Sequence, residues 1–391
     1  MIAAERAQNR AQRARPEPRR AYSFARAGHL WTPKRERLEL LGGGPCGSFA
    51  ARGAAAGGYS PLSPPGFSSL LSWLDVQRLN SLTWNTLLEK SGSGTPPDVS
   101  LSGTPTRHVN LRVEVNDVTG GTARGQAKFR WSEDGGTNWT SGVTTAASTT
   151  LGTTGFDLAW STGTYATDHV YVGKIVQIND LTGLGNHYEN VLSTGGGQLP
   201  RISLTGLNGK PSLLFDGTDD FLRRGDSTYC TALCGGNDTP STRFTVGQIV
   251  ANPTNEHFYW SVTNTTLSTS EISLIGFTSQ WTVSARGTTG SELLQKGGTT
   301  DINPHIFEYV RHGTTVSLLV TDVGGTTTTV INAAAQDANS LTVTEAFLGA
   351  IRSGANLYGN VRIGEDLAYT GALDAATRAN IRAYLARKWS F

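Results

Sequence analysis

The stretch PSLLFDGTDDFL, residues 211–222, carries much of the information about the fold. Its apolar run starts at Leu213 and is typical of a buried strand. The polar segment that follows predicts a tight turn, because aspartate side chains cap backbone amides and glycine accepts left-handed backbone. Its three aspartates, Asp216, Asp219 and Asp220, also fit a calcium site, since Ca²⁺ prefers carboxylate oxygens. We expect the turn and keep calcium as the alternative; no other cofactor is expected.

The composition of the whole chain favours strands over helices. Of its 391 residues 47 are Gly, while only 37% are hydrophobic and 16% are charged. Such a chain, rich in Gly, Thr and Ser, predicts many short strands joined by turns, and it excludes a helical bundle. The 9 Trp and 13 Phe can anchor a sizeable core. No apolar run is long enough to cross a bilayer as a helix, so no membrane contact is expected.

Residues 98–172 have a character of their own and predict a small β-sandwich. Apolar residues alternate with polar ones from Val109 to Val115 and again from Ala127 to Trp131, as in half-buried strands. The segment after Trp131 reads Glu-Asp-Gly-Gly, which is typical of a turn.

The C-terminal part of the chain predicts a hairpin and then the one convincing helix. Residues 306–310 and 316–320 flank His312-Gly313-Thr314 and are expected to pair. Asp374 is a suitable N-cap for the helix. An apolar stripe at helical spacing should pack that helix on the sandwich, and its residues are Ile381, Tyr384, Leu385 and Trp389.

Four segments resemble concanavalin A-like, laminin-G-type jelly-roll domains of bacterial and phage proteins. Ser72-Trp73-Leu74-Asp75 is similar to the opening strand, and residues 178–188 are similar to an Asp-x-Ser-Gly segment, with Ile178 where Trp is usual. Residues 211–222 are close to the family's Phe-Asp-Gly signature. Residues 369–389 resemble its closing strand and helix. The resemblance implies a jelly roll formed by residues 67–97 and 173–391.

The resemblance also implies an insertion. The family usually passes from the first to the second of these segments within a short stretch, whereas here the 98–172 module intervenes. Residues 127–139 of the module resemble a β-module that recurs in structural proteins of tailed phages. The expected fold is therefore all-β: a concanavalin A-like jelly roll with an inserted small β-sandwich, a basic N-terminal arm and a C-terminal helix.

Residues 1–66 predict that basic arm, followed by a linker rich in Gly and Pro. Residues 1–40 hold ten Lys or Arg against four Glu, a net charge of +6. We expect the arm to anchor the protein to other proteins; contact with DNA is the weaker alternative. Arg19-Arg20 is not followed by an apolar stretch, so export is not expected. The anchoring residues would be Arg6, Arg10, Arg13, Arg15, Arg19 and Arg20.

From the two phage-like resemblances we expect a non-enzymatic structural protein of a phage virion, assembled in the host cytoplasm. It would be a decoration, head fibre or tail appendage, a homo-oligomer bound to other virion proteins through the arm, and able to adhere to cell-surface glycans. The alternative is a secreted bacterial carbohydrate-binding lectin. A glycoside hydrolase is less favoured, because jelly-roll glucanases carry a Glu-x-Asp-x-x-Glu segment that this chain lacks.

Aromatic and histidine side chains on loops are the candidates for stacking on sugar rings. The candidates are His187, Tyr188, Trp260, Trp281 and Tyr358. No catalytic residue is expected. Of the three cysteines, Cys230 and Cys234 could pair only within a tight loop, so two free thiols are expected.

Overall fold

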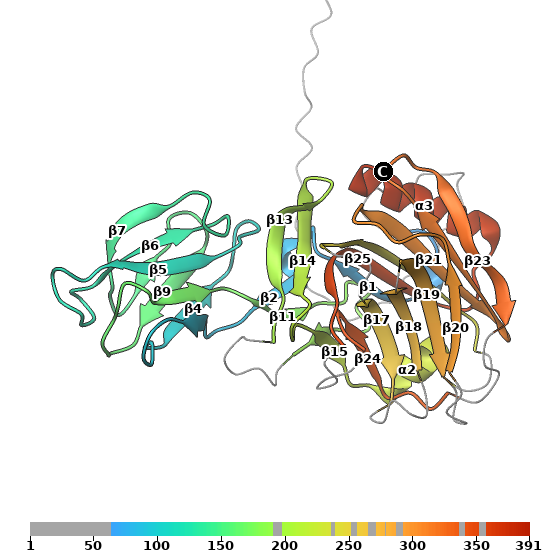
Figure 1. Cartoon of the computed structure of the whole chain (residues 1–391), viewed down its shortest axis with the longest axis horizontal. Coiled ribbons are helices and arrows are strands. Elements are labelled where there is room, and N and C mark those ends of the chain that lie inside the picture. Colours follow the sequence, from blue (N-terminus) through green and yellow to red (C-terminus); the bar gives the residue numbers. More distant parts are fainter. Residues whose placement is uncertain are drawn as a thin grey trace, which may run out of the picture. The chain divides into compact units, whose positions relative to one another are not determined.

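The described part of the chain consists of β-strands and two α-helices (Figure 1), which confirms the all-β class. The arm, with Arg6, Arg10, Arg13, Arg15, Arg19 and Arg20, lies outside the described residues, as does Cys46. No described helix is long and apolar enough to cross a membrane. The computed structural model describes residues 64–190, 198–235, 239–251, 256–264, 271–277, 279–286, 292–335, 341–351 and 357–391.

An eight-stranded antiparallel sheet, sheet A, is organised around its longest strand, β25 (Asn360–Thr370). The predicted hairpin forms within it from β21 (His305–His312) and β22 (Thr315–Thr321). The first strand, β1 (Leu70–Asp75), also pairs with β25, so both ends of the described chain meet in one sheet. The other strands, in spatial order, are β13 (Arg201–Leu207), β14 (Lys210–Asp216), β25 (Asn360–Thr370), β16 (Ser241–Ile249), β21 (His305–His312), β22 (Thr315–Thr321) and β23 (Thr327–Ala335).

A nine-stranded sheet, sheet B, packs face to face on sheet A. The ring of Trp260 meets that of Tyr309 edge-on across the two sheets, with centroids 5.3 Å apart. Trp281 meets Phe307 in the same way at 4.8 Å. The strands of sheet B, in spatial order, are β2 (Leu82–Trp84), β11 (Ile175–Ile178), β12 (Tyr188–Glu189), β15 (Leu222–Arg224), β24 (Glu345–Leu348), β17 (His257–Thr263), β18 (Glu271–Phe277), β19 (Gln280–Arg286) and β20 (Glu292–Gly297).

The strands between residues 89 and 172 form two smaller sheets, which we call the module sheets. Their shared core centres on Trp160, which contacts Phe129 at 4.6 Å and Tyr171 at 5.5 Å between ring centroids. One sheet contains β3 (Glu89–Ser91), β10 (Val170–Val172), β5 (Arg112–Asp117), β6 (Lys128–Ser132) and β7 (Thr140–Thr144), and the other contains β4 (Val99–Gly103), β9 (Phe156–Trp160) and β8 (Thr149–Thr150).

The C-terminal helix, α3 (Ala375–Trp389), begins and packs as the sequence predicts. Asp374 caps it by accepting a hydrogen bond from the Thr377 amide at 2.9 Å. The predicted stripe is buried against sheet A, in a cluster that contains Ile381, Tyr384, Leu385 and Trp389. A methyl group at Gly364 would lie 2.3 Å from the Trp389 ring, so this close approach requires glycine.

Buried carboxylates hold α3 on the sheet. Glu365 of β25 accepts hydrogen bonds from the indoles of Trp73 and Trp389, both at 2.9 Å, and from the Tyr384 hydroxyl at 2.8 Å. Its fourth partner is the Lys388 ammonium, 2.7 Å away. We call this set the Glu365 network. It joins β1, β25 and α3.

A second helix, α2 (Ser227–Cys234), has no counterpart among the predicted elements. Two short 3₁₀ turns also occur, at Phe67–Ser69 and Leu79–Ser81. Cys230 and Cys234 lie one turn apart on α2 and both are buried free thiols, as expected. Burial raises the pKa of the Cys234 thiol to about 12, which keeps it protonated.

Candidate functional site

Three of the residues proposed for stacking on sugars lie in the core. Tyr188, Trp260 and Trp281 have 0–2% of their surface exposed. Tyr188 exchanges a hydrogen bond with Tyr229 at 3.1 Å, and the two tryptophans pack between the sheets. This corrects the expectation that they lie on exposed loops: all three belong to strands, and their rings fill the sandwich.

The other two candidates make separate contacts: His187 is half-buried, whereas Tyr358 is buried with 8% of its surface exposed. His187 accepts a hydrogen bond from the Asp180 amide at 2.9 Å and so shapes its own loop. Tyr358 stacks on Phe221 with 6.4 Å between ring centroids. It lines a small pocket of about 200 Å³ together with Asp216, Gly217, Ala251, Glu256, His257 and Asn360.

The three aspartates of the 211–222 stretch come together, with carboxylate oxygens within 4.8 Å of one another. Asp216 accepts from the Thr218 amide at 2.7 Å, and Asp220 accepts from the Asp216 amide at 3.1 Å. These are the contacts expected of a capped turn. Burial raises the pKa of Asp220 to about 8, and Lys174, 3.7 Å away, opposes that rise. Calcium binding by Asp216, Asp219 and Asp220 stays a prediction.

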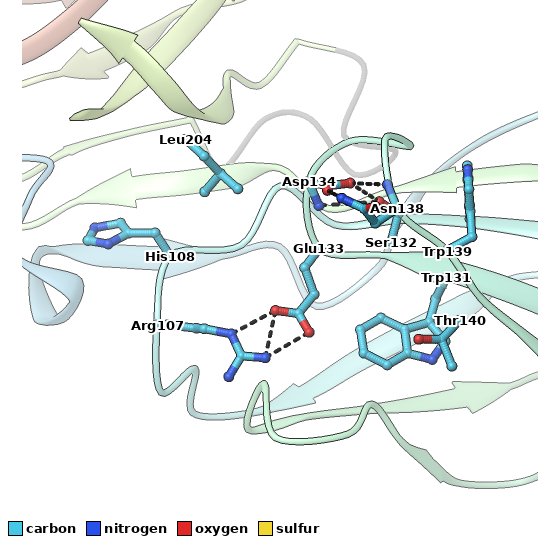
Figure 2. Close-up of a pocket in the computed structure, with 10 residues that line it drawn as sticks. All are labelled: Arg107, His108, Trp131, Ser132, Glu133, Asp134, Asn138, Trp139, Thr140 and Leu204. Atoms are coloured by element: carbon cyan, nitrogen blue, oxygen red, sulfur yellow. Dashed lines mark hydrogen bonds and ion pairs between the residues drawn. The ribbon is translucent and has the colours of Figure 1, made fainter. Parts of the chain in front are cut away.

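A different site stands out on the module sheets, at the turn that joins β6 to β7. A pocket of about 410 Å³ opens to solvent there (Figure 2). We call it the Trp139 pocket. Its lining combines indole rings with a cation, carboxylates and an amide, and consists of Arg107, His108, Trp131, Ser132, Glu133, Asp134, Asn138, Trp139, Thr140 and Leu204.

Asp134 fixes the shape of this turn. Its carboxylate accepts hydrogen bonds from the Ser132 hydroxyl at 2.6 Å, the amides of Thr137 and Asn138 at 2.9 Å, and the Asn138 side chain at 2.6 Å. These bonds, the Ser132 hydroxyl first among them, hold the pKa of Asp134 well below its ordinary value. Asp134 is therefore an ionised anchor that sets the position of Asn138.

Trp139 follows this turn and is held on one face. The Arg130 guanidinium lies 4.2 Å from the centroid of its ring. Arg130 in turn donates to Glu114 at 2.9 Å, so the stacked pair is braced from β5. A methyl group at position 136 would lie 3.1 Å from the same ring. The backbone φ of Gly136, 111°, also favours glycine. The indole is therefore positioned by the scaffold before any ligand arrives.

The other side of the pocket carries an ion pair. Arg107 donates two hydrogen bonds of 2.7 Å to the two oxygens of Glu133. It also donates to the Thr153 hydroxyl at 2.9 Å. Figure 2 shows this pair and the Asp134–Asn138 turn as two separate polar clusters. Both partners remain partly exposed to solvent.

The sequence contains a signal for this pocket, although none of its lining residues is among the predicted site residues. Two tryptophans, Trp131 and Trp139, flank a turn rich in polar residues. Such a turn places aromatic and polar groups side by side at a sheet edge. The contribution of Arg107 could not be read in the same way, because it comes from a loop distant in sequence.

Comparisons with known proteins give structural likeness only. No family model and no curated protein matches the chain. Among solved structures, an arabinofuranosidase in complex with arabinofuranosyl-α-1,2-xylobiose is 10% identical with a TM-score of 0.42, and the match covers 82% of this chain and 63% of that one. A Trypanosoma rangeli sialidase is 9% identical with a TM-score of 0.36, covering 77% and 53%. The NanB sialidase of Streptococcus pneumoniae is 16% identical with a TM-score of 0.32, covering 43% and 27%.

These neighbours contradict the expectation of a non-enzymatic virion protein. The matched structures are arabinofuranosidases and sialidases, which are carbohydrate-active enzymes. We therefore withdraw both the virion role and the statement that the protein is not an enzyme. Carbohydrate binding, which the sequence also suggested, stays a prediction. At such low identities and TM-scores the likeness assigns no activity to this chain.

Proposed function

We propose that this protein binds carbohydrate and that the Trp139 pocket holds the sugar. The observation that carries the proposal is the composition of the pocket: a fixed indole and an amide on one side, and a cation paired with a carboxylate on the other. A sugar presents a ring face of C–H groups and a circumference of hydroxyls. An aromatic ring complements the first, and charged or amide groups complement the second.

The size and rigidity of the pocket support the same proposal. Its volume of about 410 Å³ falls within the range of small-molecule sites, about 300–1,000 Å³. Arg107 is held by Glu133, Asn138 by Asp134, and Trp139 by Arg130. Little side-chain freedom is therefore lost on binding, which favours affinity.

We also infer that sheets A and B form a concanavalin A-like jelly roll. Two observations support this: β1 and α3, at opposite ends of the described chain, meet at β25, and the residues that resemble the family's opening and closing segments make that contact. The module sheets would then be an insertion carried by the jelly roll, and the Trp139 pocket would be the binding site of the protein.

Binding to a glycan panel tests the proposal. The panel includes a neutral probe, arabinofuranosyl-α-1,2-xylobiose, and an acidic probe, 3′-sialyllactose, incubated with the full chain. We expect at least one glycan to bind, and Trp139→Ala and Arg107→Ala each to weaken its affinity about tenfold or more. The products of the same incubations are analysed, which shows whether the bound sugar is also cleaved.

Phe67→Ala is the matched control for Trp139→Ala. Phe67 is 50% exposed and does not line the pocket, so its loss should leave affinity unchanged. The proposal fails if no glycan on the panel binds. It also fails if the two pocket variants bind as tightly as the Phe67 variant.

A further inference from the structure

A small cavity lies between sheets A and B, away from the Trp139 pocket. It has a volume of about 10 Å³, room for one atom-sized ligand. Residues of β16, β17, β18, β21 and α2 surround it. They are Leu233, Cys234, Ser241, Arg243, Trp260, Val262, Ile272 and Tyr309.

Arg243 is the charged residue in this lining, and only 2% of its surface is exposed. Its Nε donates to both carboxylate oxygens of Asp366, at 3.0 and 3.1 Å. Its guanidinium lies over the Trp260 ring, 4.4 Å from the centroid. The Nη1 and Nη2 atoms have no hydrogen-bond partner among the described residues. A buried cationic N–H group without a hydrogen-bond acceptor costs free energy. The unpaired Nη1 and Nη2 atoms of Arg243 therefore point to a ligand that accepts from them.

Two more groups in the same lining share this property. The Ser241 hydroxyl and the Trp260 indole nitrogen are buried and have no hydrogen-bond partner within the described chain. Both can donate, and neither guanidinium nor indole nitrogen can accept. A water molecule must place its own two hydrogens on acceptors, and the acceptors among the polar side chains of this lining are the hydroxyl oxygens of Ser241 and Tyr309. A ligand that only accepts hydrogen bonds satisfies all of these donors at once.

The charge around the cavity favours the same kind of ligand. Arg311 lies directly opposite Ser241 in the pairing of β16 and β21, so their side chains share one face of sheet A. It is fully buried and donates to the Cys234 carbonyl at 2.9 Å. Thr245 and Asp366 are also directly opposite each other, and among the described residues Asp366 supplies the carboxylate contact of Arg243. Two guanidinium groups therefore lie close to the cavity.

We propose that this cavity binds one small monovalent anion, chloride, through Arg243, Ser241 and Trp260. The anion lies between β16 of sheet A and β17 of sheet B and ties the two sheets together. It binds the folded chain only, because the donors converge only when the sheets pack. Chloride therefore stabilises the fold, and its site is separate from the sugar pocket.

The first test compares thermal unfolding of the full chain in sodium chloride and in sodium gluconate at equal ionic strength. Gluconate is too large for the cavity, so it serves as the inert anion. We expect chloride to lower the unfolding equilibrium constant by the factor 1 + [Cl⁻]/Kd and to raise the melting temperature accordingly. Equal melting temperatures in the two salts would contradict the proposal.

The second test locates the ligand directly. Crystals grown in chloride are measured at a wavelength where chlorine scatters anomalously. We expect a peak within hydrogen-bonding distance of the Arg243 Nη atoms and the Ser241 hydroxyl. An ordered water without anomalous signal at that position would overturn the assignment to an anion.

A pair of serine variants separates the site from general effects of burial. Ser241→Ala removes one donor and should reduce the response to chloride. Ser212→Ala is the matched control, because Ser212 is also a buried serine without a hydrogen-bond partner in the described chain, but does not line the cavity. Its response to chloride should equal that of the original protein. The proposal fails if the two variants respond alike.

Discussion

Glu365 and Arg243 are both buried ionisable residues on sheet A, but they differ in how many of their polar atoms have partners. Glu365 is surrounded by four donors, one from β1 and three from α3. Arg243 has one carboxylate partner for Nε and none within the described chain for Nη1 and Nη2. The comparison teaches that a buried charge saturated by its own protein holds a fold together, whereas one left with free donors points to a ligand.

Breaking the Glu365 network should have the largest effect. In Glu365→Gln an amide group replaces one oxygen and faces either Trp73 and Tyr384 or Trp389 and Lys388, because each carboxylate oxygen accepts from one of these pairs. Because these groups are then left unmatched, we expect a loss of about 3–5 kcal/mol in the free energy of unfolding. Urea denaturation of both proteins measures it. A loss below 1 kcal/mol would show that the network does not hold α3 in place.

Glu308 offers an intermediate case. It is fully buried and pairs with Arg378, at 2.8 Å, and with Arg382, both on α3. These arginines keep about a fifth of their side-chain surface exposed, so water can solvate them when the charge is lost. We expect Glu308→Gln to cost about 1–3 kcal/mol, less than Glu365→Gln. The reverse ranking by the same denaturation assay would contradict this reading of the comparison.

Asp220 shows a third response to burial, protonation. Its pKa of about 8 lies above the ordinary value of 3.8, because burial disfavours the charged form. Between these values the unfolded chain has lost the proton that the folded chain retains, so stability should fall as pH rises from about 4 to 8. The slope is at most about 1.4 kcal/mol per pH unit.

Asp220→Asn should remove this part of the pH dependence, since an amide does not titrate. Asp219, which remains in both proteins, provides the internal background. The measurement is the free energy of unfolding of both proteins at several pH values from 4 to 8. Parallel curves would show that Asp220 is ionised in the folded protein.

The sequence predicted those parts of the fold that depend on local pattern. The stripe from Ile381 to Trp389 repeats at helical spacing, and α3 buries it. The 306–320 hairpin is marked by its turn at Gly313, and β21 pairs with β22 there. Such signals lie within a few residues of one another, which is why they can be read without the fold.

The sites were harder to predict because they depend on which face a residue occupies. Trp260 and Trp281 could line a surface site or fill the core, because an aromatic side chain suits both. Only the sheet register shows that they point into the core. Trp139 is recognisable beside its polar turn, but its partner Arg107 arrives from a distant loop. The Arg243 cavity likewise combines β16 with β17 and α2, and no segment of the sequence shows that meeting.

The pairing of β1 with β25 also has a consequence in time. Trp73 donates to a carboxylate 292 residues further along the chain. At a synthesis rate of about 5–20 residues per second, Trp73 is made roughly 15–60 s before Glu365. During that interval the opening strand cannot form its native pairing, and contacts so distant in sequence also form slowly in a released chain. Assembly of sheet A around β25 therefore follows synthesis of the strands that it joins.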